Sequence, residues 1–274
     1  MNTSDYSEQL AHLEYFDESI MPLLNALGDV KPNPVQWVTL GMLGRLSYAS
    51  KGIHTLLPHY SKDISFNYPI GILLRPILLD ALTALRLYAR LKELLRQKAD
   101  DSVVNSSISE LGMQILSDGL DIFIRDARLF KDNGFISESE RIDVIHALTD
   151  EWPDFFVHSK TKNEEPVLKH NESLGAKKHF TSLVQDKDLH TISEQLYINY
   201  IWFSKYDHFG MLYFSALKRT RPEHDAFVIG SIDLFIHHFA NLCDMLQRVS
   251  PENNTIHEGY IKAMNYLHVK LARK

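Results

Sequence analysis

The chain has 274 residues, a formal net charge of -6 and 45% hydrophobic residues, which together indicate a globular protein with a sizeable core. The negative charge argues against a surface that coats nucleic acid, so we do not expect a nucleic-acid partner. Cys243 is the only cysteine, which excludes an intramolecular disulfide. The first residues lack the basic and apolar regions of a secretory signal. We therefore expect a cytoplasmic protein.

Apolar residues recur at spacings of three and four along most of the chain, which predicts helices. The expected helices span 4–27, 34–57, 68–97, 107–130, a stretch opening at Ser137, 190–219, 222–249 and 255–272. Boundaries are marked by Pro34, by Asn133-Gly134 and by a capping box between Ser137 and Glu140. Convincing strand patterns are absent. The sequence predicts one all-α domain over 1–274, a helical bundle of seven to nine helices.

Residues 151–189 interrupt this pattern with a long segment that shows no clear periodicity. The segment is rich in lysine and histidine, so it is locally basic on an acidic protein. Long connections of this kind are uncommon in compact domains and tend to be mobile or to cover binding sites. We expect an irregular loop, either a solvated insertion or a lid.

The longest apolar run, residues 69–91, is the best candidate for a membrane span. It contains Asp80, Arg86 and Arg90 as well as Arg75, and each such charge costs about 2.5–3.5 kcal/mol near the centre of a bilayer. The leucines and isoleucines return only about 0.3–0.6 kcal/mol apiece. The sequence predicts no membrane partner.

Arg75 lies inside the apolar stretch GILLRPILLD, where a charged residue needs a partner. On a straight helix Asp80 lies about 140° away from Arg75, so the two cannot easily pair. Arg75 is therefore expected to point at another helix, toward a carboxylate or the anionic group of a ligand. We take Arg75, Asp80 and Arg86 as candidate ligand-binding residues; the alternative is a structural salt bridge or a side chain that reaches solvent.

The segment from 193 to 217 has aromatic residues on every side, so it is expected to be buried around much of its circumference. Tyr200, Ser204 and His208 follow one line along it. A histidine beside hydroxyl groups can act as a general base, which makes these three residues candidate catalytic groups. The alternative is a hydrogen-bonded polar network that only stabilises the core.

Asp233 and His237 are four residues apart and could share a metal ion, but two ligands do not make a site. They could equally belong to the wet face of an amphipathic helix. The sequence has no phosphate-binding glycine loop, HExxH, CxxC or GxSxG motif. We expect no metal and no cofactor.

An arginine followed closely by a histidine is the catalytic signature of the HEPN ribonucleases. The chain contains this spacing at Arg141 and His146, and again at Arg219 and His224. Chance alone predicts about two such pairs in a chain of this composition, so the spacing has little weight. Ile142 also stands where that family usually has a polar residue.

Two segments, LLRPILLDALTALRLY and YINYIWFSKYDHFG, resemble a group of uncharacterised bacterial all-helical proteins that are compared with HEPN domains. In that group an arginine and an acid open an apolar helix, and a later helix ends with Tyr, Ser and His. The acid here is Asp80 in place of the usual glutamate. The resemblance implies a bacterial helical bundle with an internal polar pocket and no established reaction.

Three functions remain open from the sequence. The first is an internal polar pocket for a small anionic ligand, with or without catalysis, where the Arg75 helix meets the His208 helix. The second is a non-enzymatic module for protein–protein interaction. The third is HEPN-like RNA cleavage in defence or stress. A homodimer is compatible with each of them.

Overall fold

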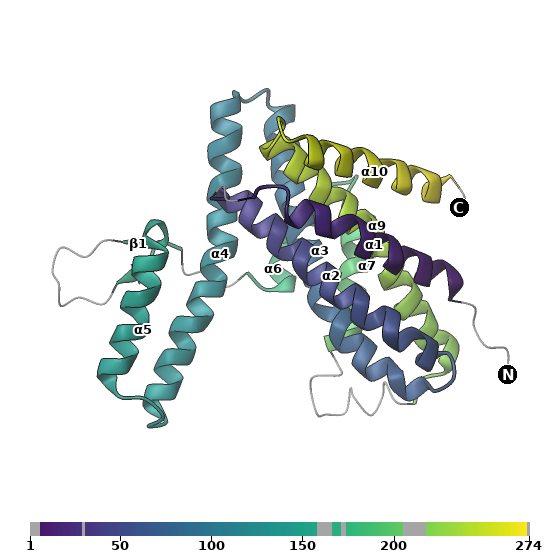
Figure 1. Cartoon of the computed structure of the whole chain (residues 1–274), viewed down its shortest axis with the longest axis horizontal. Helices are drawn as coiled ribbons and strands as arrows, with labels where there is room; N and C mark the ends of the chain where they lie inside the picture. Colours follow the sequence, from purple (N-terminus) through teal and green to yellow (C-terminus); the bar gives the residue numbers. More distant parts are fainter. Residues whose placement is uncertain (1–5, 29–30, 158–165, 171–173, 205–217, 273–274) are drawn as a thin grey trace. The chain divides into compact units, whose positions relative to one another are not determined.

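The computed structural model describes residues 6–28, 31–157, 166–170, 174–204 and 218–272 (Figure 1). Its α-helices are α1 Ser7–Leu24, α2 Pro34–Tyr60, α3 Asn67–Arg96, α4 Asp101–Asp132, α5 Glu138–Glu151, α6 Ala176–Leu183, α7 His190–Ser204, α9 Arg221–Val249 and α10 Asn254–Leu271. The remaining elements are the 3-10 turns η1 Ile64–Phe66 and η2 Pro153–Phe155 and the strands β1 Phe156–Val157 and β2 Val167–Leu168. The prediction of an all-α bundle is confirmed.

The chain divides into two compact units. Unit 1 comprises Met1–Ala99 and Gly175–Lys274, and unit 2 comprises Asp100–Leu174. The expectation that 1–274 forms one domain concerns how these units combine, and it stays a prediction.

Helices α3 and α9 form the centre of unit 1 (Figure 1). Helix α3 packs on α2, α6, α7 and α9, while α9 packs on α1, α2, α3, α7 and α10. Within the described ranges, α9 is the one helix long and apolar enough to cross a membrane, although 61% of its most apolar stretch is buried inside the protein. That burial is what a core helix of a bundle shows, because it is surrounded by other helices on most sides.

Helix α3 continues through Pro76 without a break. Proline removes one backbone hydrogen bond and crowds the preceding turn. The ring of Pro76 is exposed on the outer side of the helix, whereas Leu74 and Ile77 beside it are fully buried. The packing of these neighbours therefore offsets the cost of a proline inside the helix.

The end of α3 is closed by a Schellman motif, in which Ala99 donates to the carbonyl of Leu94 and Lys98 donates to that of Leu95. The motif requires a left-handed residue, and Lys98 occupies that position with φ of 53°. Side chains other than glycine are disfavoured in this conformation.

Lys98→Gly is expected to raise the free energy of unfolding by about 0.5–1 kcal/mol, because glycine adopts this conformation without steric cost. Urea denaturation of both proteins measures the difference. Lys98→Ala is the control, since alanine removes the same charge and keeps the strain. An equal effect of both substitutions would assign the change to charge and not to the backbone.

Unit 2 is built on a hairpin of α4 and α5. Gly134, with φ of 75°, ends α4 in a second Schellman motif, as the sequence predicted from Asn133-Gly134. The predicted capping box is also confirmed: the Ser137 side chain accepts from the Glu140 amide, and the Glu140 carboxylate accepts from the Ser137 amide. The hairpin is therefore fixed by local signals at both sides of its turn.

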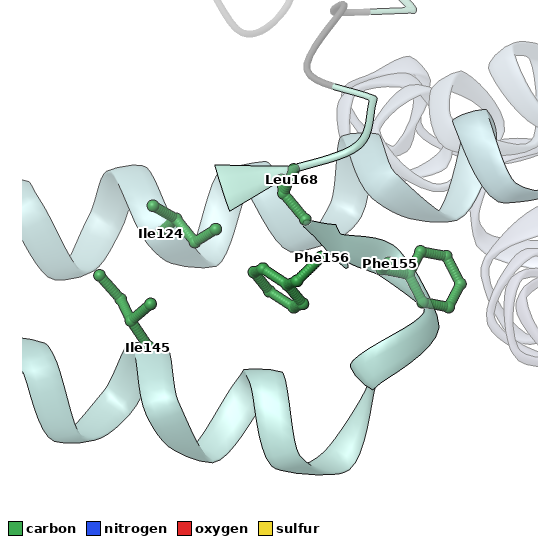
Figure 2. Close-up of a cluster of buried hydrophobic side chains, with 5 residues drawn as sticks. All are labelled: Ile124, Ile145, Phe155, Phe156 and Leu168. Atoms are coloured by element: carbon green, nitrogen blue, oxygen red, sulfur yellow. The ribbon is translucent and has the colours of Figure 1, made fainter. Parts of the chain in front are cut away.

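A small hydrophobic cluster holds unit 2 together, and its members come from α4, α5, η2 and the two strands (Figure 2). The five buried residues are Ile124, Ile145, Phe155, Phe156 and Leu168. Figure 2 shows the Phe156 ring between the strands and the two helices. Because Phe156 and Leu168 face each other across the antiparallel strand pair, the short sheet closes one side of the hairpin.

The segment 151–189 is more regular than the sequence indicated. Its described part contains η2, the two strands and helix α6, and the chain passes from unit 2 to unit 1 within it. The expectation of a wholly irregular loop is therefore wrong for these stretches. Strands of two residues and a helix of eight residues are too short to give a readable periodicity.

A buried polar network joins α1, α2 and α9 in unit 1. Asp225 accepts hydrogen bonds from the hydroxyls of Tyr6 at 2.8 Å and Tyr60 at 2.6 Å. Arg221 donates to the backbone carbonyl of Tyr60 at 2.6 Å and lies over the same ring. Burial, together with the hydrogen bond to Asp225, raises the pKa of Tyr60. Most of these groups are hydrogen-bonded to one another, which is the arrangement of a structural network.

Candidate functional site

Arg75 points at a different helix, as its position on α3 predicted. Its guanidinium lies over the ring of Tyr200 in α7, with 5.5 Å between the guanidinium carbon and the ring centroid. The sequence predicted a carboxylate or the anionic group of a ligand as the partner of Arg75. The structure shows in addition a contact with the face of an aromatic ring. Stacking of this kind stabilises a half-buried arginine by about 0.5–2 kcal/mol.

Of the other two candidate catalytic residues, the structure describes Ser204. The Ser204 hydroxyl donates to the carbonyl of Ile201 in its own helix at 2.8 Å. His208 lies outside the residues that the structure describes. Of the proposed catalytic line, the structure therefore places Tyr200 beside Arg75 and turns Ser204 back to its own backbone.

Asp80 is buried at 3% exposure and pairs with Arg45 of α2, whose nitrogen lies 2.6 Å from Oδ1. Its second oxygen has no hydrogen-bond partner within the described ranges. Burial raises the pKa of Asp80 to about 7, although the Arg45 guanidinium acts to lower it. Asp80 is therefore part of the α2–α3 interface, and the inference that it does not pair with Arg75 agrees with this contact.

The remaining candidates are Arg86 in unit 1 and the pair Arg141 and His146 in unit 2. Arg86 is half-buried on α3. Arg141 is buried and held by Glu138 at 2.6 Å, with His146 exposed. Neither position adds support to the ribonuclease alternative.

The second arginine–histidine pair lies in unit 1. His224 is buried and hydrogen-bonded to Asn67, while Arg219 lies over the ring of Trp202 at 4.1 Å. The imidazole is thus engaged inside the core, and the guanidinium is stacked on a ring.

A polar cleft of about 350 Å³ lies between α7 and α9 in unit 1. Its lining consists of Gln195 and Asn199 from α7 and of Ala226, Phe227, Gly230, Asp233, Leu234 and His237 from α9. The α9 residues recur at spacings of one and three, so they belong to one face of that helix. The volume is within the range of small-molecule sites.

Gly230 keeps the middle of this cleft open. A side chain begun at its Cβ would approach the Asn199 amide nitrogen at 3.8 Å, which is ordinary van der Waals contact. Alanine would therefore fit at this position, whereas a long side chain would extend into the space between the helices.

Asn199 is fixed by a buried hydrogen bond in which its amide nitrogen donates to the Ser231 hydroxyl at 2.9 Å. This bond uses one of the two amide hydrogens, so the other hydrogen and the carbonyl oxygen are groups that can bond to a ligand. Asn199 thus contributes a fixed polar group to the cleft.

Asp233 is held from the opposite side by α1. Gln9 donates to its Oδ1 at 3.2 Å, and His12 Nε2 lies 3.8 Å from the same oxygen. His12 is in turn paired through Nδ1 with the Tyr266 hydroxyl at 2.7 Å. Two side chains of α1 therefore fix the carboxylate, which is the support that a recognition group needs to keep one orientation.

The aromatic wall of the cleft is the ring of Phe227. It stacks on Trp202 with 3.8 Å between centroids and 12° between planes, and Arg219 covers the other face of Trp202. Phe227 is fixed in place by this stack and offers an apolar surface next to the polar groups.

Asp233 and His237, which the sequence marked as a metal candidate or a wet face, are thus neighbours on the wall of a cleft. No group of three His, Cys, Asp or Glu within the described ranges is placed to hold a metal ion. Sequence reasoning did not include Gln195 and Asn199. These two polar residues are four positions apart, so they share one side of a helix that is otherwise rich in aromatic residues. That spacing could have predicted a polar edge on this helix.

Comparisons with known proteins give no information about this site. No family model matches the chain, and neither a curated protein nor a solved structure is similar to it. The resemblance to bacterial HEPN-like proteins therefore stays a prediction.

Proposed function

We propose that unit 1 binds a small molecule in the cleft between α7 and α9. The observation that carries the proposal is the convergence of Asn199, Asp233 and His237 on one opening of about 350 Å³. Sites of this size that combine an apolar wall with a few fixed polar groups are the usual form of small-molecule sites.

The lining favours a ligand that carries an ammonium or similar cationic group. Asp233 is the one carboxylate and no lysine or arginine is among the described lining residues. A carboxylate has about four acceptor positions, so Asp233 can serve more than one donor at a time. The Asn199 carbonyl adds a second acceptor, and the face of Phe227 attracts cations.

The ligand class differs from the one expected at the sequence level, where Arg75 and Arg86 suggested an anion. The anionic hypothesis keeps one supporting observation, namely that Arg75 and Tyr200 lie together between α3 and α7. The two hypotheses therefore concern different faces of α7 and predict binding of ligands with opposite charge.

Binding can be tested with two matched pairs of probes, tyramine against 4-hydroxyphenylacetate and putrescine against succinate. We expect the amines to bind and raise the melting temperature, and the acids to have no effect. Asp233→Asn is expected to weaken amine binding about tenfold or more, since a hydrogen bond to a charged group contributes about 1.5–3 kcal/mol. Isothermal titration calorimetry measures the affinities.

Glu194→Gln is the matched control, because Glu194 is exposed on α7 and does not line the cleft. Gly230→Leu is expected to abolish binding of both amines by filling the opening. Tight binding of the acids, weakened by Arg75→Gln and not by Asp233→Asn, would replace this proposal with the anionic one. Absence of binding by all four probes would contradict both.

A further inference from the structure

Unit 2 exposes a continuous set of large apolar side chains on α4 and the turn that follows it. We call Ile122, Phe123, Leu129, Phe130 and Phe135 the apolar stripe. Their exposed fractions are 49%, 63%, 56%, 49% and 77%. Single exposed hydrophobic residues are normal on a protein surface, but five neighbours of this size on one short segment are not.

The stripe follows the spacing of helices that pack against each other. Ile115, Ile122 and Leu129 repeat every seven residues along α4, and Phe123 and Phe130 form a second, shorter track, while Leu116 one repeat earlier packs against the hairpin core. A repeat of seven drifts by only about 20° around a straight helix, so each track stays on one side. The hairpin core uses another side of α4, where Ile124 and Ala127 are buried.

Part of the stripe has a local explanation. Phe135 donates its backbone N–H to the carbonyl of Phe130 at 2.9 Å, and the two rings meet edge to face at 6.3 Å. This is the hydrophobic contact of a Schellman motif. It accounts for the position of Phe135 but leaves Ile122, Phe123 and Leu129 without a role inside the hairpin.

The area of the stripe is close to what half of a stable interface needs. Phenylalanine carries about 150–250 Å² of surface, so the three rings at their exposed fractions present roughly 300–450 Å². With the half-exposed Ile122 and Leu129, the total is about 500 Å² per chain. Two copies would bury about 1,000 Å² of apolar surface before any polar rim, against about 1,200–2,000 Å² in specific interfaces.

The charges on the same stretch, of which Asp126 lies within the stripe, bear on the kind of partner. The same stretch of α4 carries Asp121, Arg125, Asp126, Arg128, Lys131 and Asp132. Three acidic and three basic groups cancel, so neither a strongly acidic nor a strongly basic partner is favoured. A second copy brings both signs to a two-fold interface, where each residue of one type can meet its complement.

We propose that the apolar stripe of α4 is the interface of a homodimer, in which two α4–α5 hairpins pack through this face. The occupant of each stripe is the stripe of a second copy. The interface lies in unit 2 and is independent of the ligand cleft in unit 1, so either proposal can fail without the other.

Light scattering after size-exclusion chromatography of the full chain tests the dimer. We expect the dimer to predominate at about 100 μM, with micromolar dissociation. The double variant Phe123→Glu, Leu129→Glu is expected to be monomeric at that concentration. Both side chains are exposed, so its circular dichroism and melting temperature should otherwise match those of the unchanged monomer at high dilution.

Tyr48→Glu is the control, because Tyr48 is also a large exposed side chain but lies on α2 of unit 1. Asp126→Cys supplies a second readout, since Asp126 is midway between Ile122 and Phe130 and Cys243 is buried. Oxidation should cross-link this variant through the dimer. An unchanged chain that stays monomeric at 100 μM, or a dimer that survives the double substitution, would overturn the proposal.

Discussion

Arg45→Met is expected to lower the free energy of unfolding by about 2 kcal/mol at pH 8 and by much less at pH 5. Breaking a fully buried ion pair costs about 3–5 kcal/mol, and the smaller value follows because Arg45 is 59% exposed. The pKa of Asp80 is about 7 although Arg45 acts to lower it, so at pH 8 the variant must either bury the carboxylate without its cation or take up a proton, and both cost free energy. At pH 5 the carboxyl is protonated, and the loss of Arg45 matters little.

Urea denaturation at both pH values measures this difference. Lys51→Met is the matched control, since Lys51 pairs with Asp17 on the surface at 3.0 Å and such pairs contribute about 0–1 kcal/mol. In an Asp80→Asn background, Arg45→Met should have little effect at either pH. A loss that is the same at pH 5 and pH 8 would show that Arg45 acts through packing and not through Asp80.

Asp80 and His238 are expected to give opposite pH dependences that cancel between pH 3.8 and 6.5. Burial lowers the pKa of His238 from 6.5 to about 3, with Arg45 adding to the effect. The contribution of His238 to stability is present above pH 6.5 and is lost as the pH falls toward 3. The pKa of Asp80 is raised from 3.8, so its contribution is present below 3.8 and is lost as the pH rises through 7.

In that window each residue changes the free energy of unfolding by about 1.4 kcal/mol per pH unit, with opposite sign. Relative to the unchanged chain, Asp80→Asn should therefore become more stable as the pH rises. His238→Leu should become less stable over the same range. Chemical denaturation at pH 4.5, 5.5 and 6.5 measures both slopes, with tryptophan fluorescence followed in a Trp152→Phe background so that only Trp37 and Trp202 of unit 1 report.

The double variant provides the check on this interpretation. With both groups removed, the difference from the unchanged chain should not depend on pH. Parallel slopes of the two single variants would contradict the pKa shifts from which the prediction is drawn.

Most helices could be predicted from the sequence because their periodicity is long and their ends carry local signals. Pro34 lies at the start of α2, and Ser137 with Glu140 caps α5 as expected. The site could be predicted only in fragments. Local spacing indicated that Arg75 turns toward another helix and that Asp233 and His237 share a face.

The rest depends on which faces of which helices meet, and spacing within one helix does not contain that information. No pattern in the sequence could identify Arg45 as the partner of Asp80, because 35 residues separate them. Gln9 is even farther from Asp233 in sequence, and a polar residue at the start of α1 looks like any solvated position. Tertiary packing decides both contacts.

Unit 1 is formed by two segments of the chain, one before and one after unit 2 in the sequence. This order affects folding during synthesis. Helices α1, α2 and α3 leave the ribosome first, but α7, α9 and α10, which cover them, follow only after the 75 residues of unit 2. At about 5–20 residues per second, this adds roughly 4–15 seconds during which the apolar faces of α3 wait for their partners. Nascent chains paused before Gly175 should therefore be the stage of synthesis at which this protein most needs a chaperone.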